Sequence, residues 1–187
     1  MRLLLPVTLS LWVTLAHAEI LPPLQTLQRL HEAESFRQSK LAPTEVRQIL
    51  QQIKATAFDT AKSWQKELRV RRISLQSVDG LIVQGSDLLC GATGNCQTWV
   101  FRKDRRRWMS LFLNQAPVAA GFGFAMVATH RIPDFLVAAH VSADEVDYAS
   151  YSYDGQNYSV ARCYRAKPDG QQAEEKPCKQ LRPMGGE

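Results

Sequence analysis

Residues 148–164 read YASYSYDGQNYSVARCY, two tyrosine-rich runs on either side of Asp154-Gly155. Aromatic residues are frequent in strands, and an Asp-Gly pair between two such runs is a strong signal for a tight turn. The stretch therefore predicts a β-hairpin made of Tyr148–Tyr153 and Tyr158–Tyr164.

Similar short runs, separated by turn residues, fill the chain from about residue 67 onward. Further turns are marked by Asp79-Gly80, Lys103-Asp104 and Pro117. Strands at near-regular spacing indicate an antiparallel sandwich, barrel or blade-like sheet. The eight expected strands are Leu68–Leu75, Leu81–Gly85, Thr98–Arg102, Trp108–Leu113, Phe122–Ala128, Phe135–His140, Tyr148–Tyr153 and Tyr158–Tyr164.

The β-rich part also contains a weak internal sequence repeat at an offset of about 50 residues, which predicts two four-stranded units. Residues 81–83, 99–101 and 108 match residues 135–137, 151–153 and 158. The second half, Pro133-Asp134-Phe135-Leu136-Val137 followed by Tyr151-x-Tyr153-Asp154-Gly155-x-x-Tyr158, resembles a β-propeller blade of the FG-GAP or VCBS type. It lacks the Asp-x-Asp-x-Asp calcium loop of many such blades. Two blades cannot close a propeller, so the two units are expected to pack on each other or to use the N-terminal helix as a cover.

The N-terminus has the pattern of a secretory signal peptide. Arg2 supplies positive charge, Leu3 to Leu15 is apolar, and Ala16-His17-Ala18 fits a cleavage site. The apolar run of about 13 residues is shorter than the roughly 20 that a spanning helix needs. Cleavage is expected after Ala18, and Glu19 stands where a lipoprotein would carry cysteine. No later segment is long and apolar enough to span a membrane.

An amphipathic helix is expected after Ala42-Pro43-Thr44, where Glu45 suits the helix dipole. Its apolar side chains recur at three- and four-residue intervals, typical of a packing face. They are Val46, Ile49, Leu50, Ile53, Ala57, Ala61 and Trp64. The chain is therefore divided into a signal peptide (1–18), an N-terminal helical segment (19–66), a β domain with two repeat-like halves (67–165) and a flexible C-terminal tail (166–187), which is rich in Pro, Gly and Gln.

Four cysteines in an exported chain indicate disulfides, and four cysteines allow three pairings. We expect Cys90 to pair with Cys96 around a loop with two glycines, and Cys163 to pair with Cys178 in the tail. A zinc site is the alternative, but the spacing between Cys90 and Cys96 is wider than in a usual zinc knuckle.

The most unusual patch is a run of basic residues flanked by aromatic ones. On a hairpin tip, it would combine positive charge with aromatic faces, which can hold phosphates, carboxylates or sugars. The ordinary alternative is a solvated turn that protects a sheet edge from aggregation. The candidate binding residues are Arg102, Lys103, Arg105, Arg106, Arg107 and Trp108, and the Trp108 ring is expected to pack in the sheet.

Other polar residues offer weaker possibilities. A hydrolase could use His140 as base, Ser142 or Ser150 as nucleophile and Asp144 as orienting acid. No Gly-x-Ser-x-Gly elbow accompanies them. Asp144, Glu145, Asp147 and Asp154 could hold calcium, although their spacing does not match an EF-hand loop.

The chain of 187 residues has net charge +5, or +4 once Arg2 is removed with the signal peptide. This is weaker than in a dedicated nucleic-acid binder. We therefore expect an exported, non-enzymatic binding or structural domain, periplasmic or secreted, that recognises an anionic envelope or extracellular partner, without cofactor, metal or nucleic acid.

Two alternatives stay open: a hydrolase that uses the His140 region, and an inhibitor of a cell-wall-degrading enzyme. Bacterial lysozyme inhibitors are similarly small exported eight-stranded β proteins. Their Ser-Gly-x-x-Tyr loop is absent here. A basic chain is also a poor electrostatic match for a basic lysozyme.

Overall fold

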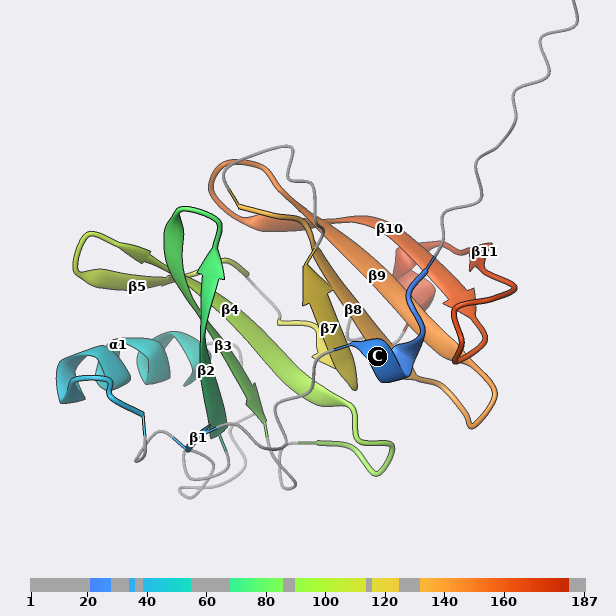
Figure 1. Ribbon diagram of the computed structural model, residues 1–187, viewed down its shortest axis with the longest axis horizontal. Coiled ribbons are helices and arrows are strands. Elements are labelled where there is room, and N and C mark those ends of the chain that lie inside the picture. The colour runs from blue at the N-terminus through green and yellow to red at the C-terminus, as the bar shows by residue number, and fades with distance from the viewer. Residues whose placement is uncertain are drawn as a thin grey trace, which may run out of the picture.

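The computed structural model describes residues 21–27, 34–35, 39–54, 68–85, 90–113, 116–124 and 132–181. Within these ranges two antiparallel β-sheets pack face to face as a sandwich, and one α-helix lies on the outer side of the first sheet (Figure 1). The expected class, mainly β with an N-terminal helical segment, is confirmed. The expected signal peptide, residues 1–18, lies outside the described residues.

The first sheet is built on a meander of four consecutive strands. Because each strand pairs with its neighbour in sequence, short turns suffice to connect β2 to β3 and β4 to β5. In order, the sheet contains β1 (Glu34–Ser35), β2 (Leu68–Leu75), β3 (Val78–Gly85), β4 (Cys96–Asp104) and β5 (Arg107–Ser110), and β6 (Val118–Ala119) pairs with the first residues of β4.

The second sheet repeats this plan with β7 (Gly121–Phe124), β8 (Phe135–His140), β9 (Val146–Tyr153), β10 (Tyr158–Ala166) and β11 (Glu174–Glu175). The predicted Asp-Gly hairpin is confirmed: it joins β9 to β10, with Tyr153 opposite Tyr158. Asp154 Oδ1 accepts hydrogen bonds from the backbone N–H groups of Gln156 (2.7 Å) and Asn157 (2.8 Å). Gly155 has φ +104°, a conformation that side chains disfavour, so both turn residues are needed as they stand. Each half of the β region is thus built on a four-stranded meander, β2–β5 and β7–β10, to which the short strands β1, β6 and β11 are added.

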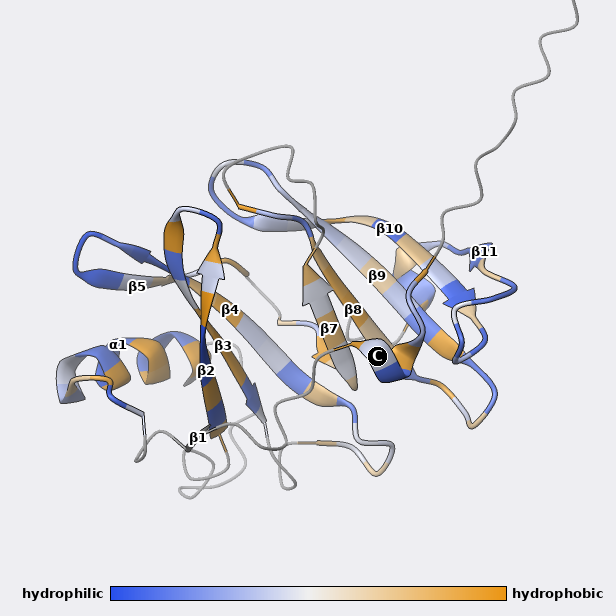
Figure 2. Ribbon diagram, viewed as in Figure 1, coloured by the Kyte–Doolittle hydropathy of each residue, from blue (hydrophilic) through white to orange (hydrophobic). Residues whose placement is uncertain are grey.

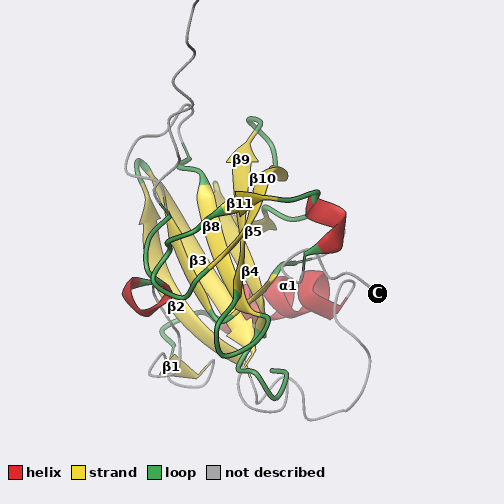
Figure 3. Cartoon of the chain, turned by 90° about the vertical axis from the view of Figure 1, so that its right-hand side faces the viewer, coloured by secondary structure: helices red, strands yellow, loops and turns green. Residues whose placement is uncertain are grey.

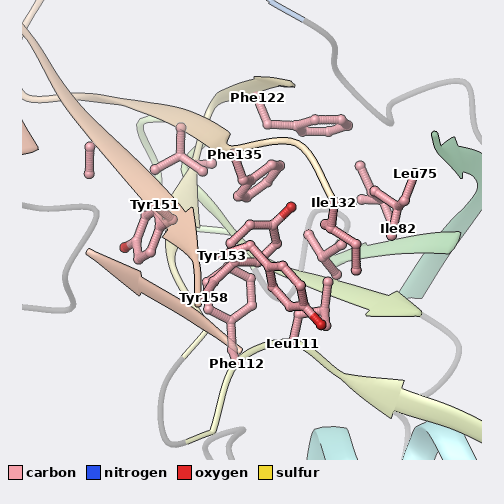
Figure 4. Close-up of a cluster of buried hydrophobic side chains, with 14 of the residues drawn as sticks. Leu75, Ile82, Leu111, Phe112, Phe122, Ile132, Phe135, Tyr151, Tyr153 and Tyr158 are labelled. Carbon is pink, nitrogen blue, oxygen red and sulfur yellow. The ribbon is translucent and has the colours of Figure 1, made fainter. Parts of the chain in front are cut away.

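The core between the sheets is aromatic. Phe112, Phe122, Phe135, Tyr151 and Tyr158 gather there, as Figure 4 shows. Phe135 stacks on Tyr158 with ring centroids 5.8 Å apart, and Phe112 meets Tyr151 edge-on at 5.3 Å. Such pairs add roughly 0.5–1.5 kcal/mol beyond the burial of their area. The contact between Phe112, which follows β5, and Tyr151 of β9 links the two halves of the sandwich.

The first sheet is buried on both faces at the middle of β3. In β3, Ile82 points into the sandwich, whereas Leu81 and Val83 point to the opposite face. That opposite face is covered by α1 (Pro43–Lys54), whose Ile49 and Ile53 are fully buried. Burial on both faces explains why Leu81, Ile82 and Val83 are apolar in succession, without the alternation of a half-exposed strand. Figure 3 shows α1 against β4 and β5. The expected stripe residues beyond α1, from Ala57 to Trp64, lie outside the described residues.

The outer face of the second sheet is covered by the N-terminal segment 21–27, in which Leu24–Thr26 forms a 3₁₀ turn, η1. Leu21 and Leu24 are buried with Tyr148 and Tyr164. The Tyr148 hydroxyl donates to the backbone oxygen of Pro22 (3.0 Å). The described chain therefore has four layers: α1, two sheets and this segment.

One expected turn is wrong. Asp79-Gly80 lies inside β3, and the turn falls at residues 76–77, where Gln76 has φ +59°. Gly80 is needed because neighbouring side chains pack against its Cα, and not because the chain turns there. A Cβ at Gly80 would lie 2.8 Å from both the Ile73 and the Leu75 side chains, so glycine alone leaves room for them. The turn expected at Lys103-Asp104 likewise shifts, to residues 105–106.

Both predicted disulfides, Cys90–Cys96 and Cys163–Cys178, are confirmed. The C-terminal tail differs from its expectation of no regular structure. Up to Leu181 it contains β11, paired with β10, and a 3₁₀ turn, η4 (Cys178–Gln180). The second disulfide and the buried Leu181 side chain (2 % exposed) hold this part against the sandwich core.

Candidate binding site at the β4–β5 hairpin

The basic run forms the β4–β5 hairpin. Asp104 pairs with Arg107, so Arg105 and Arg106 make the turn. Arg105 has φ +53°, in the left-handed region. A side chain there costs roughly 1–2 kcal/mol. Figure 2 shows this tip as one of the hydrophilic ends of the first sheet.

The structure separates the six predicted binding residues into three groups. Arg105, Arg106 and Arg107 are exposed, and Arg102 and Lys103 are partly buried. Trp108 is only 1 % exposed, which confirms that its ring packs in the sheet. The aromatic face predicted to help hold a ligand is therefore not presented at the surface.

Lys103 and Trp108 are engaged by the helix. Glu45 Oε1 accepts hydrogen bonds from Lys103 Nζ (3.0 Å) and from Trp108 Nε1 (3.1 Å). Lys103 Nζ also lies 5.1 Å from the centroid of the Trp108 ring, in cation–π geometry. The backbone N–H of Ala42, followed by Lys103, lowers the pKa of Glu45 below its ordinary value by hydrogen bonding to the carboxylate. The charged carboxylate of Glu45 thus holds α1 against the hairpin.

Two glutamines of α1 cover the free edge of β5. Gln52 Nε2 donates to the Trp108 backbone oxygen (2.8 Å), and Gln52 Oε1 accepts from the Ser110 N–H (2.8 Å). Gln48 Oε1 accepts from the Trp108 N–H (3.4 Å). The side-chain amides therefore take the place of a neighbouring strand. They satisfy the backbone hydrogen-bonding groups at the edge of β5 and hold the hairpin against α1.

In the part of the chain that the structure describes, the arginines at the tip have no ion-pair partner. Within the described residues, Arg102, Arg105, Arg106 and Arg107 make no ion pair. Nε of Arg102 is buried and has no hydrogen-bond partner among those residues. Three exposed guanidinium groups on one braced hairpin can form paired hydrogen bonds with a phosphate, sulfate or carboxylate from outside the chain.

Sequence reasoning missed part of this basic end. Because Gly80 pairs with both Ile73 and Arg102, the β2–β3 and β4–β5 turns lie at the same end of the sheet. Arg71 and Arg72 on β2 are exposed near this end. The basic run at 69–72 was the available signal. The brace was also missed, although Glu45, Gln48 and Gln52 follow one helix face at spacings of three and four.

The residues considered for hydrolysis have structural contacts. The Ser142 hydroxyl accepts from the backbone N–H of Asp144 (3.2 Å), which stabilises the β8–β9 turn. Asn95 holds the backbone of His140: its Oδ1 accepts from the N–H (2.8 Å) and its Nδ2 donates to the carbonyl oxygen (2.9 Å). Asn95 therefore docks the Cys90–Cys96 loop on the end of β8. Hydrolysis at this place stays a prediction.

The acidic residues considered for calcium do not meet. Asp144 and Asp154 lie beyond opposite ends of β9. Asp147 is fully buried and accepts from Arg165 Nε (2.8 Å) and Nη2 (3.2 Å). The hydrogen bond with Asp147 raises the pKa of Arg165. The Arg165 side chain also lines a hollow of about 250 Å³, together with Glu145, Lys167, Glu174 and Lys176. Among the described residues, no three His, Cys, Asp or Glu side chains are placed to hold a metal ion.

No known family model, curated protein or solved structure matches this chain. Of the helices that the structure describes, none has the length and apolar character to cross a membrane. The blade resemblance of the second half stays a prediction.

Proposed function

We propose that this chain is an exported, non-enzymatic domain that binds an anionic component of the cell envelope or extracellular space through Arg105, Arg106 and Arg107. The observation that carries the proposal is the set of three exposed arginines, without ion pairs to any described residue, on a hairpin that α1 holds in place. A braced hairpin loses little conformational freedom on binding, so more of the interaction energy remains as affinity.

The two disulfides support an oxidising compartment. Together with the signal-peptide pattern of residues 1–18, they favour a periplasmic or secreted location. Lipid headgroups, acidic glycans and acidic proteins are the anions that such a compartment offers.

The direct test is Arg105→Ser/Arg106→Ser/Arg107→Ser in the mature, oxidised chain. Binding is measured at low and high salt on a heparin column, on polyglutamate and on vesicles with phosphatidylglycerol. The wild type should bind at least one probe. The triple variant should lose about tenfold or more at low salt, since each basic residue contributes about 1 kcal/mol near an anionic surface. Salt should shrink the difference, because exposed charges are screened beyond about 8 Å at physiological ionic strength.

A lysine triple variant is the matched control, because it keeps the charge but loses the planar fork of the guanidinium. All three side chains are exposed, so the melting temperature should be unchanged in both variants. A serine variant that folds normally and binds every probe as the wild type does would reject the proposal. So would a wild type that binds none of them at low salt.

A further inference from the structure

We propose that the anionic partner is the surface of a phospholipid bilayer, and that Met109, on the hairpin beside Arg107, and Leu113, three residues beyond the end of β5, enter its headgroup region. This inference rests on the proposed function and names the partner that the same hairpin contacts. It is carried by an apolar feature that charge alone does not explain.

Met109 and Leu113 are the large hydrophobic side chains that stand exposed in the described part of the chain, at 43 % and 71 %. Both follow the arginine run within six residues of Arg107. Single exposed apolar residues are common on protein surfaces. These two instead follow the three exposed cations in the sequence, Met109 within β5 and Leu113 three residues beyond its end.

The strand geometry puts Met109 on the side of the sheet that α1 leaves open. Side chains alternate along β5, and Trp108 faces the helix, so Arg107 and Met109 point the other way. Met109 lies directly opposite Arg102 across β4 and β5. One face of the hairpin therefore combines Arg102, Arg107 and Met109.

This combination fits a membrane surface better than a soluble polyanion. Phosphates of anionic lipids attract basic residues, and the boundary just beneath them accepts apolar side chains. A sulfated glycan or an acidic peptide offers the charge but no apolar layer for Leu113. Two partly exposed apolar side chains give only weak, reversible attachment, so binding should need both the cations and the apolar pair.

The test uses Met109→Ser/Leu113→Ser, which keeps every arginine. Sedimentation with phosphatidylcholine vesicles, with and without phosphatidylglycerol, is compared with retention on heparin. The wild type should bind the anionic vesicles and much less the neutral ones. The apolar double variant should bind anionic vesicles about tenfold more weakly, given the apolar area that it withdraws from burial. That loss should persist at high salt, while retention on heparin stays unchanged.

The outcomes for the two variants distinguish a failure of this inference from a failure of the proposed function. If Met109→Ser/Leu113→Ser binds vesicles as the wild type does, or if the wild type binds heparin but no vesicles, the bilayer is wrong and a soluble anion remains the partner. If Arg105→Ser/Arg106→Ser/Arg107→Ser leaves every probe unaffected, the proposed function fails, and the inference fails with it. A matched charge control is Lys167→Ser/Lys179→Ser, which removes exposed cations after β10 and should change neither probe.

Discussion

Glu45 illustrates how one side chain can fix a surface hairpin. It accepts hydrogen bonds from Ala42, Lys103 and Trp108, and the last two lie about 60 positions further along the chain. The sequence predicted only that Glu45 favours the start of a helix. Its contacts with the hairpin could not be predicted, because they depend on how α1 crosses the sheet.

Glu45→Ala should lower the free energy of unfolding by about 2 kcal/mol at neutral pH, since it leaves the buried indole N–H (Nε1) of Trp108 without an acceptor. Urea unfolding measures this loss. Because the folded-state pKa of Glu45 is depressed, its contribution is present above the ordinary value of 4.5 and is lost as the pH falls through the folded-state value. The difference between variant and wild type should therefore shrink in acid. Glu45→Gln, which keeps an acceptor for Trp108, should lose less at neutral pH. An equal loss in both variants would contradict the role of the Trp108 bond.

At the scale of elements, the free edge of β5 is closed by side chains of α1. Gln48 and Gln52 satisfy the backbone groups of Trp108 and Ser110 that a further strand would otherwise pair. Such an edge, if opened, becomes a template for association between chains.

Gln48→Ala/Gln52→Ala should cost about 2–3 kcal/mol, because the variant removes three partly buried hydrogen bonds to β5 and the one from Gln52 Nε2 to the Gln48 backbone oxygen. It should also self-associate at concentrations where the wild type does not, as light scattering can show. Gln51→Ala is the matched control: Gln51 is exposed on the same helix and should tolerate the change. Equal behaviour of the double variant and this control would refute a closing role for the glutamines.

The strand pattern predicted the elements better than their ends. All eight expected strands exist in part, because alternation and aromatic runs report burial directly. The two-residue strands β1, β6 and β11 were missed, since two residues carry no periodicity. Asp79-Gly80 misled because glycine serves close packing as well as turns, and only the neighbouring side chains of Ile73 and Leu75 reveal which applies.

At the scale of the whole molecule, the first described segment, which contains Leu21 and Leu24, contacts the turn after β10, which contains Pro168 and Gly170. The Leu24 N–H donates to the Pro168 oxygen (2.8 Å). A Cβ on Gly170 would lie 2.2 Å from the Leu21 oxygen. The candidate site could be predicted as a run of arginines, and the disulfides as local loops, because both are local in sequence. This contact joins residues far apart in the chain and left no local pattern.

Gly170→Ala should displace the N-terminal segment from the second sheet. Burial, followed by the charge of Asp169, raises the pKa of Tyr148 to about 12 in the wild type. Loss of the cover should bring the pKa of Tyr148 back toward the ordinary value of 10.0, which absorbance titration can follow. Gly94→Ala is the control, since Gly94 has a similar φ (+72° against +81°) but nothing within 4 Å of an added Cβ. It should carry the backbone strain alone and leave the titration of Tyr148 unchanged. No shift of the Tyr148 titration in Gly170→Ala would contradict the prediction.

If the chain is exported as proposed, the same contact sets the order in which its parts can fold. A chain that crosses a membrane from its N-terminus delivers Leu21 and Leu24 first, yet Tyr164 and Pro168, which receive them, arrive among the last. The hairpins of the first sheet join neighbours in sequence and can form while the rest is still in transit. The leading segment must wait uncovered, a temporary target for proteases or holding chaperones. The outer face of the second sheet and the Cys163–Cys178 bridge can be completed only once these late residues are available.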